Sequence, residues 1–135
     1  MNESTQEQYN IRQLSQEFHI PSQTLRRFCS RGLVPGARRT RTGRLTFTPE
    51  QATWLRTLVF LQSCGFSSSE LKRYATLCRQ GNDTIPERKA MLETKKRQIW
   101  QTIEDAQANI DFIERKTDIF DQALAGNGEL PSQWF

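Results

Sequence analysis

The most distinctive chemistry in this 135-residue sequence is a segment rich in arginine and free of acid. Residues 18–49 contain no Asp or Glu. The same stretch holds seven arginines: Arg26, Arg27, Arg31, Arg38, Arg39, Arg41 and Arg44. From Glu50 onward, eleven Lys or Arg stand against twelve Asp or Glu, so that part is nearly neutral. A basic block on a neutral body is the electrostatic pattern of a polyanion binder. A solvated basic face without a partner is the alternative, disfavoured because clustered like charges repel one another.

Other reactive residue types form no recognisable set. We find no carboxylate pair, nucleophile with an adjacent base, or phosphate-binding glycine loop, so we expect no enzyme and no cofactor. Cys29, Cys64 and Cys78 are far apart and outside any C-x-x-C pair, which favours free thiols over a disulfide framework or a metal site. The single histidine, His19, falls in an expected turn and is interpreted as solvated.

Composition places the chain outside the membrane classes. It is 36% hydrophobic and 25% charged, with a mean hydropathy of −0.71. No apolar run approaches the roughly 20 residues that a spanning helix needs. The first ten residues are polar and acidic, unlike a signal peptide. We therefore expect no membrane partner, a cytoplasmic location and a disordered N-terminus over residues 1–8.

Two short helices are predicted in the first third of the chain. Apolar residues recur at helical spacing over residues 9–18. After a break at residues 19–21, a second helix runs to about Arg31, with Pro21 in its first turn and Gly32 as its stop. Two such helices joined by a tight turn predict a helix-turn-helix.

A basic hairpin is expected next. Residues 34–37 and 44–47 are predicted to pair as strands, with residues 38–43 as the tip. A basic hairpin directly after the second helix of a helix-turn-helix is interpreted as a wing.

Three capping-box patterns divide the remaining sequence into helices. Thr48 with Gln51 opens a strongly apolar helix that should form the core. Ser67 with Glu70 opens another, and residues 9–81 are expected to form one winged helix-turn-helix domain. Residues 84–87 open a last helix that runs to about residue 125, followed by a tail over residues 126–135.

The last helix carries two interleaved heptad series. One series is Leu92, Ile99, Ala106, Ile113 and Phe120, and the other is Ile103, Ile110, Thr117 and Leu124. Such a narrow apolar stripe on a charged helix is typical of a coiled coil. Packing within one chain explains it less well, because at about 1.5 Å per residue the helix is too long to fold back on a small domain. The fold class is thus mainly α: a winged helix-turn-helix with a small β-hairpin wing, and a long C-terminal helix forming an antiparallel coiled-coil homodimer.

These features resemble the MerR family of transcription regulators. The resemblance rests on Thr24-Leu25-Arg26 followed by Gly32-Leu33, on wing residues 37–40 with Gly43 and Phe47, and on residues 65–67 followed by Glu70-Leu71. It covers about residues 9–125 and is closest to the small members that lack a separate ligand-binding domain. The chain departs from the family pattern at Arg27, Phe28 and Cys29, and in the wing at Arg44-Leu45.

The resemblance implies a mechanism and partners. Family dimers bind an inverted repeat in promoter DNA whose spacer is too long. An effector makes them bend and untwist the double-stranded DNA so that RNA polymerase can engage both promoter elements. The protein is then expected to be associated with the nucleoid and to respond to an unknown small-molecule effector. The cysteines that mark metal-sensing members are missing from residues 84–88 and 125–135, so no metal is expected.

Individual roles follow for the basic segment. Arg26 matches the arginine that contacts the DNA backbone in the family, while Gln23 and Ser22 are expected to face the groove, where Gln can read adenine. Phosphate contacts are expected from Arg27, Arg38, Arg39 and Arg44, and further DNA contacts from Tyr9 and Phe28. Arg31 can either hold a phosphate or cap its own helix.

An effector pocket is expected between the long helix and the helix before it. The residues expected to line it are Tyr74, Leu77, Cys78, Trp100, Trp134 and Phe135. Two other functions stay open: an excisionase-like architectural factor that bends DNA without an effector, and a coiled-coil module that binds an acidic protein.

Overall fold

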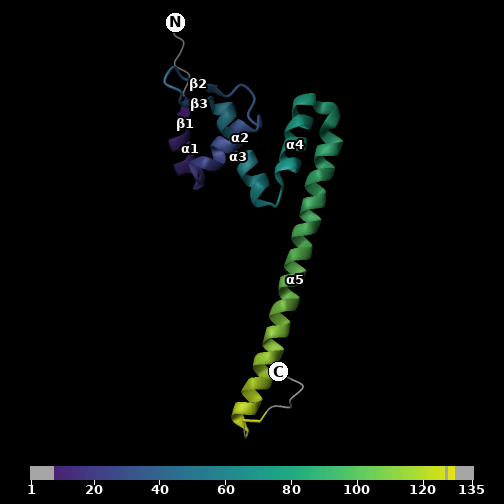
Figure 1. Cartoon of the computed structure of the whole chain (residues 1–135). Coiled ribbons are helices and arrows are strands. Elements are labelled where there is room, and N and C mark those ends of the chain that lie inside the picture. The colour runs from purple at the N-terminus through teal and green to yellow at the C-terminus, as the bar shows by residue number, and fades with distance from the viewer. Residues whose placement is uncertain (1–7, 127, 130–135) are drawn as a thin grey trace. The chain divides into compact units, whose positions relative to one another are not determined.

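A computed structural model describes residues 8–126, 128 and 129 (Figure 1). The chain divides into two compact units, residues 1–92 and residues 93–135. The expected disordered segment 1–8 lies outside the described residues except for Gln8, and the tail is described only at Gly126, Gly128 and Glu129.

The first unit begins with a strand where the sequence had suggested a helix. Tyr9–Asn10 form β1, and the helix α1 spans Ile11–Phe18. The prediction that residue 9 starts the helix is wrong because Asn10 is the N-cap: its side chain accepts from the Gln13 backbone N–H at 2.8 Å, and Gln13 bonds back to the Asn10 N–H. Tyr9, directly before the cap, is extended and pairs with Phe47 of another strand.

The turn after α1 sets the helix-turn-helix. His19 is exposed and adopts a left-handed conformation with φ 56°, which ends α1. Ser15 Oγ donates to the Ile20 carbonyl at 2.6 Å, which ties the turn to α1. The helix α2 then spans Ser22–Ser30, with Pro21 as its N-cap. The two helices are in direct contact, so the helix-turn-helix prediction is confirmed.

The wing is a hairpin whose first strand is later than predicted. Strands β2, Arg38–Arg39, and β3, Leu45–Phe47, are antiparallel, and the sheet order is β1-β3-β2. Residues 34–37 instead make a turn in which the Ala37 N–H bonds to the Val34 carbonyl at 3.3 Å. The turn is imposed by Pro35, which has no N–H to give a partner strand, and by Gly36 with φ 73°.

Two helices complete the domain, and both of their predicted caps are present. The helix α3 spans Pro49–Ser63 and begins with the Thr48–Gln51 capping box. The helix α4 spans Ser68–Gln80 and begins with the Ser67–Glu70 box.

The third predicted capping box is replaced by other contacts. A short 3-10 helix, η1, covers Asn82–Thr84, and the helix α5 spans Ile85–Ala125. The Thr84 hydroxyl donates toward the carbonyls of Leu77 and Gly81, at 2.6 and 2.7 Å. Glu87 pairs with Arg73 of α4. The Thr84 contacts therefore fasten η1 to the end of α4, and the Glu87 pair fastens the first turn of α5 to the middle of α4.

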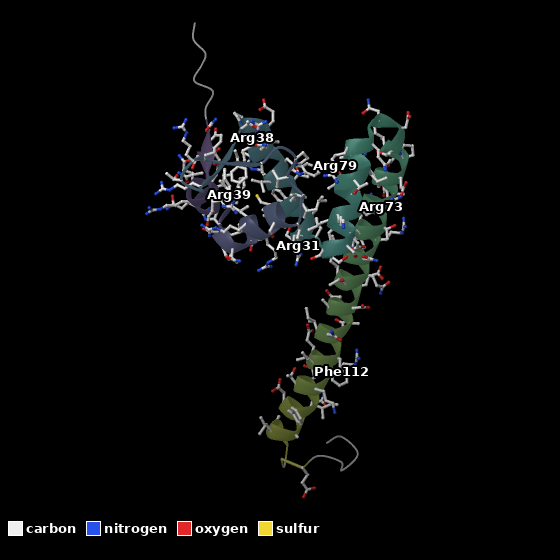
Figure 2. The ribbon with its side chains drawn as sticks, turned by 45° about the horizontal axis from the view of Figure 1, so that its top comes forward. Arg31, Arg38, Arg39, Arg73, Arg79 and Phe112 are labelled. Atoms are coloured by element: carbon white, nitrogen blue, oxygen red, sulfur yellow. The ribbon has the colours of Figure 1, made fainter. Side chains whose placement is uncertain are left out.

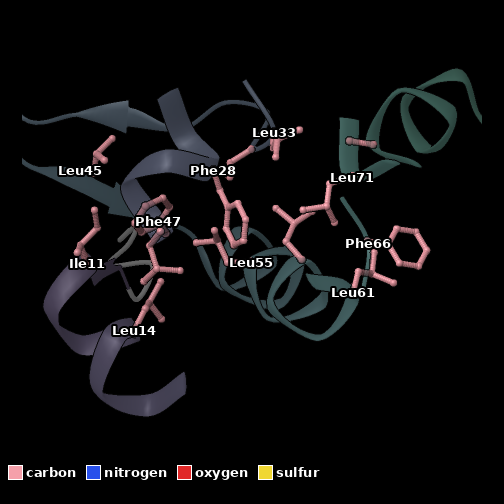
Figure 3. Close-up of a cluster of buried hydrophobic side chains, with 14 residues drawn as sticks. Ile11, Leu14, Phe28, Leu33, Leu45, Phe47, Leu55, Leu61, Phe66 and Leu71 are labelled. Atoms are coloured by element: carbon pink, nitrogen blue, oxygen red, sulfur yellow. The ribbon is translucent and has the colours of Figure 1, made fainter. Parts of the chain in front are cut away.

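One hydrophobic core holds the first unit together (Figure 3). Leu14 of α1, Leu25 of α2, Phe47 of β3 and Leu55 of α3 are each at most 1% exposed. Because α1, α2, α3, α4 and the wing strand β3 all contribute to one core, the helix-turn-helix and the wing are held in fixed relation.

The second unit is the continuation of α5. Its large apolar residues are exposed: Ile99, Trp100, Ile103, Ile110, Phe112, Ile113, Phe120 and Leu124. The long helix predicted from residue 84 is confirmed to within one residue. Among the described residues, no helix is both long and apolar enough to span a bilayer.

Candidate nucleic-acid interface

The helix α2 presents a polar face opposite its buried face. Leu25 and Phe28 point into the core and are 0% and 2% exposed. Gln23, Arg26 and Arg27 are exposed. The predicted DNA contact by Phe28 is therefore wrong for this structure, because its ring packs against other core side chains. Gln23, Arg26 and Arg27, on the polar face, are exposed and accessible to a DNA groove.

A hollow of about 520 Å³ lies beside this face and is lined by four arginines. Arg12 comes from α1, Arg26 from α2, Arg39 from β2, and Arg44 from the wing tip. Asn10 and Ser22 also line it, and none of the lining residues within the described part of the chain is Asp or Glu. Four guanidinium groups around a concave surface without carboxylates suit phosphate oxygens, which Arg binds by paired hydrogen bonds.

The start of α2 adds a second element to this hollow. Its N-cap, Pro21, makes no side-chain capping bond, and of the first-turn N–H groups that of Thr24 bonds to the Pro21 carbonyl at 3.0 Å. Ser22, the first residue of the helix, lines the hollow. Free N–H groups at a helix N-terminus attract phosphate through hydrogen bonding and the helix dipole.

The wing tip is stiffened by hydrogen bonds of its own. Arg39 donates from Nη1 to the Gly43 carbonyl at 2.7 Å, and the Thr40 N–H bonds to the Arg44 carbonyl at 2.6 Å. Gly43 has φ 83°, a conformation that favours glycine. Arg38 and Arg39 are adjacent on β2 (Figure 2), so their side chains leave opposite faces of the strand. Of these two arginines, only Arg39 lines the hollow.

Tyr9 is not brought to this hollow. It is half-buried, packs on the core and lines a different depression together with Glu17 and Arg56. Arg12, in contrast, was missed by the sequence reasoning. It precedes the acid-free segment, and only the fold places its helix start beside the wing.

A smaller basic hollow of about 310 Å³ lies at the start of α4. It is lined by Arg31, Lys72, Ser68, Ser69 and Leu33. Arg31 donates to the Ser68 hydroxyl, so its side chain joins the end of α2 to α4. The two roles considered from the sequence, a phosphate contact or a cap on its own helix, stay predictions.

Cys29 lies behind the basic face. Burial raises the pKa of its thiol above the ordinary value of 9.0, and the positive charge of Arg39 opposes this only in part. The thiol is therefore protonated at neutral pH. The described residues contain no group of three or more His, Cys, Asp or Glu arranged to hold a metal ion.

The residues predicted for an effector pocket are dispersed. Tyr74 is stacked on Trp54, with centroids 6.4 Å apart, and meets Phe66 edge-on. Leu77 is 1% exposed, so the structure gives it no surface for a ligand. Cys78 accepts from Arg88 Nη1 at 3.7 Å and lines a hollow on the side of α4 toward α3. Trp100 is exposed on the second unit, and Trp134 and Phe135 lie outside the described residues.

The fold and this basic face together define a winged helix-turn-helix regulator that binds DNA. The profile of the MerR HTH family regulatory proteins matches residues 9–77. The chain belongs to this family, which confirms the resemblance drawn from the sequence.

Individual proteins similar to this chain are also transcriptional regulators. An HTH-type transcriptional regulator of Haemophilus influenzae, described as uncharacterised, is 29% identical over 117 residues, or 87% of each chain. The HTH-type transcriptional regulator AdhR of Bacillus subtilis is 28% identical over 90 residues, covering 67% of this chain and 64% of that one. The crystal structure of HiNmlR, a MerR family regulator lacking the sensor domain and bound to promoter DNA, superposes with a TM-score of 0.77 at 28% identity. That match covers 93% of this chain and 98% of the other.

Proposed function

We propose that this protein is a homodimeric regulator that binds an inverted repeat in promoter DNA. The observation that carries the proposal is the hollow ringed by Arg12, Arg26, Arg39 and Arg44 at the uncapped start of α2. Such a surface holds the phosphate backbone, while Gln23, exposed on the same helix, reads base edges. The promoter-DNA complex of the structurally similar HiNmlR supports the choice of ligand.

The apolar stripe of α5 supports the homodimer. Ile103, Ile110 and Phe120 are 49%, 48% and 42% exposed in the single chain. Exposed branched and aromatic side chains at heptad positions are stabilised when a second copy covers them. A self-complementary seam has two-fold symmetry, and a symmetric dimer requires a DNA site with the same symmetry.

Regulation is proposed to act through the shape of the promoter. Bending a site by 40–90° costs about 1–6 kcal/mol, which a small-molecule effector can offset only by binding the bent complex more tightly. RNA polymerase then engages both promoter elements. Under this mechanism the effector changes transcription strongly and DNA affinity little.

Fluorescence anisotropy with a duplex selected from random sequence by rounds of binding tests the DNA proposal. Four phosphate contacts per protomer predict that log K falls with log salt with a slope of about −0.9 for each contact. A slope near zero, with tighter binding to an acidic protein, would favour the interaction-module alternative.

The promoter spacer tests the distortion mechanism. Shortening it by two base pairs should make transcription independent of the protein. If transcription from the shortened promoter still requires the protein, distortion is not how it acts. An excisionase-like factor would bend DNA but show no response of transcription to any effector.

A further inference from the structure

A second hollow lies on the side of α4 that faces α3, away from the four arginines. Its volume is about 280 Å³. Its walls are mostly apolar: the Trp54 indole, the Pro35 ring, Ala75 and the Cys78 thiol. Glu50 and Arg79 also line it, and their opposite charges leave the site without net charge.

Three side chains of this hollow also hold one strap of backbone. The strap, residues 31–37, joins the end of α2 to the first strand of the wing. Trp54 Nε1 donates to the Leu33 carbonyl at 2.6 Å and Gln51 Nε2 to the Pro35 carbonyl at 3.0 Å. Arg79 Nη1 donates to the Gly32 carbonyl at 3.4 Å. Whatever fills the hollow therefore touches the groups that position both DNA-binding elements.

We propose that this hollow binds a small neutral aromatic molecule of one or two rings, and that its occupancy adjusts the strap between α2 and the wing. The volume is near the lower end of ligand sites, which suits one or two rings and excludes a helix. An indole wall favours an aromatic guest through ring stacking, and a thiol beside an aromatic ring is also favourable. The Trp54 N–H and the Gln51 amide are already bonded to the strap, so a polar guest finds few free partners.

The proposal has two parts: a molecule binds in the hollow, and its binding moves the strap. Only the second part rests on the proposed function, because the strap positions the elements proposed to hold DNA. Binding itself can be measured without DNA. The two parts therefore fail separately.

Indole is the probe for the binding part. In the full-length ¹⁵N-labelled protein, the Trp54 Nε1–H resonance, assigned with Trp54→Phe, should shift saturably as indole is added. The Trp100 resonance, from an exposed residue of the second unit, should stay in place. Nuclear Overhauser contacts between indole and the Ala75 methyl should appear in the wild-type protein.

Cys78→Phe is the matched variant, since it fills the hollow, and should weaken indole binding at least tenfold. Cys64→Phe, at an exposed position outside the hollow, should leave it unchanged. If Cys78→Phe does not fold, the contacts to Ala75 in the wild type decide the question. Equal shifts at all tryptophans, or no saturable shift, would overturn the proposal. So would binding that appears only after residues 129–135 are removed, because the tail would then be the occupant.

The output is measured by energy transfer between dyes at the ends of the selected duplex. Saturating indole should change the end-to-end distance for the wild type and not for Cys78→Phe. A duplex that is bent to the same extent with and without bound indole would overturn the coupling to the strap. A duplex that stays straight both with and without indole would instead contradict the proposed distortion mechanism.

Discussion

The indole of Trp54 in α3 donates to the backbone carbonyl of Leu33 at 2.6 Å, across 21 positions of sequence. Leu33 itself is 2% exposed. The bond therefore links the core helix to the segment between α2 and the wing, where little water is available to replace it. Its removal gives the first prediction.

Trp54→Phe should lower the free energy of unfolding by about 1–3 kcal/mol, because it leaves a partly buried carbonyl without its donor while keeping an aromatic ring. Urea unfolding followed by circular dichroism measures the change. Trp100→Phe, at an exposed position, is the control and should change stability by less than about 0.5 kcal/mol. Equal effects of both variants would show that the Leu33 bond contributes nothing specific.

Arg39→Ala should weaken binding to all DNA sequences and make the salt slope shallower by about one unit, because it removes a phosphate contact. Arg56→Ala is a matched control: this arginine is exposed but pairs with Glu17, outside the arginine hollow. Anisotropy titrations from low to high salt provide the slopes. An unchanged slope for Arg39→Ala would exclude a contact between this residue and phosphate.

Gln23→Ala should act differently from Arg39→Ala. Loss of a base contact should relax the preference at one base pair of each half-site by about 1–3 kcal/mol. Competition between selected duplexes that differ at single positions measures the preference. A uniform loss across all duplexes would place Gln23 on the backbone instead.

Ile110→Asp should dissociate the dimer, because it buries a charge within the apolar seam. Gln98→Asp adds the same charge to α5 outside both heptad series and should leave the dimer intact. Light scattering at micromolar concentration distinguishes dimer from monomer. A dimeric Ile110→Asp protein would mean that the seam lies on another face.

Cys29 should react slowly with iodoacetamide at pH 8, since the thiolate is the reactive form and burial raises the pKa of this thiol. Exposed Cys64 should react first, as read by mass spectrometry. The raised pKa also makes stability depend on pH, because the folded protein releases the Cys29 proton less readily than the unfolded chain does. The free energy of unfolding should be unaffected below the ordinary pKa of 9.0 and should fall as the pH rises past it. Cys29→Ser should flatten this decline.

Local signals predicted most of the helices because capping boxes and apolar spacing act over a few residues. The caps at Thr48 and Ser67 are examples, each satisfied within one turn. The predicted local structure was wrong where a residue far away in the sequence determines the conformation or the contact. Tyr9 is a strand residue because Phe47 pairs with it, and Glu87 leaves its expected cap because Arg73 is near.

The same distinction applies to the basic face. The sequence located Arg26, Arg39 and Arg44 because they share one acid-free segment. It did not find Arg12, which joins them only through the packing of α1 beside the wing. It included Phe28 because the family position suggested a contact, while the helical phase of α2 turns that ring into the core.

The hydrogen bond from Arg39 to the Gly43 carbonyl also has an entropic consequence. Fixing a long side chain on binding costs about 0.5–1.5 kcal/mol in lost rotamer freedom. Arg39 has given up part of that freedom on folding, because its guanidinium is already held by the wing. Arg41 and Arg44 are exposed at the same tip, and within the described part of the chain neither side chain has a hydrogen bond or ion pair, so we expect DNA to order them. The wing therefore carries one arginine, Arg39, that is held in place before DNA binds, and two others, Arg41 and Arg44, that we expect to become ordered only on binding.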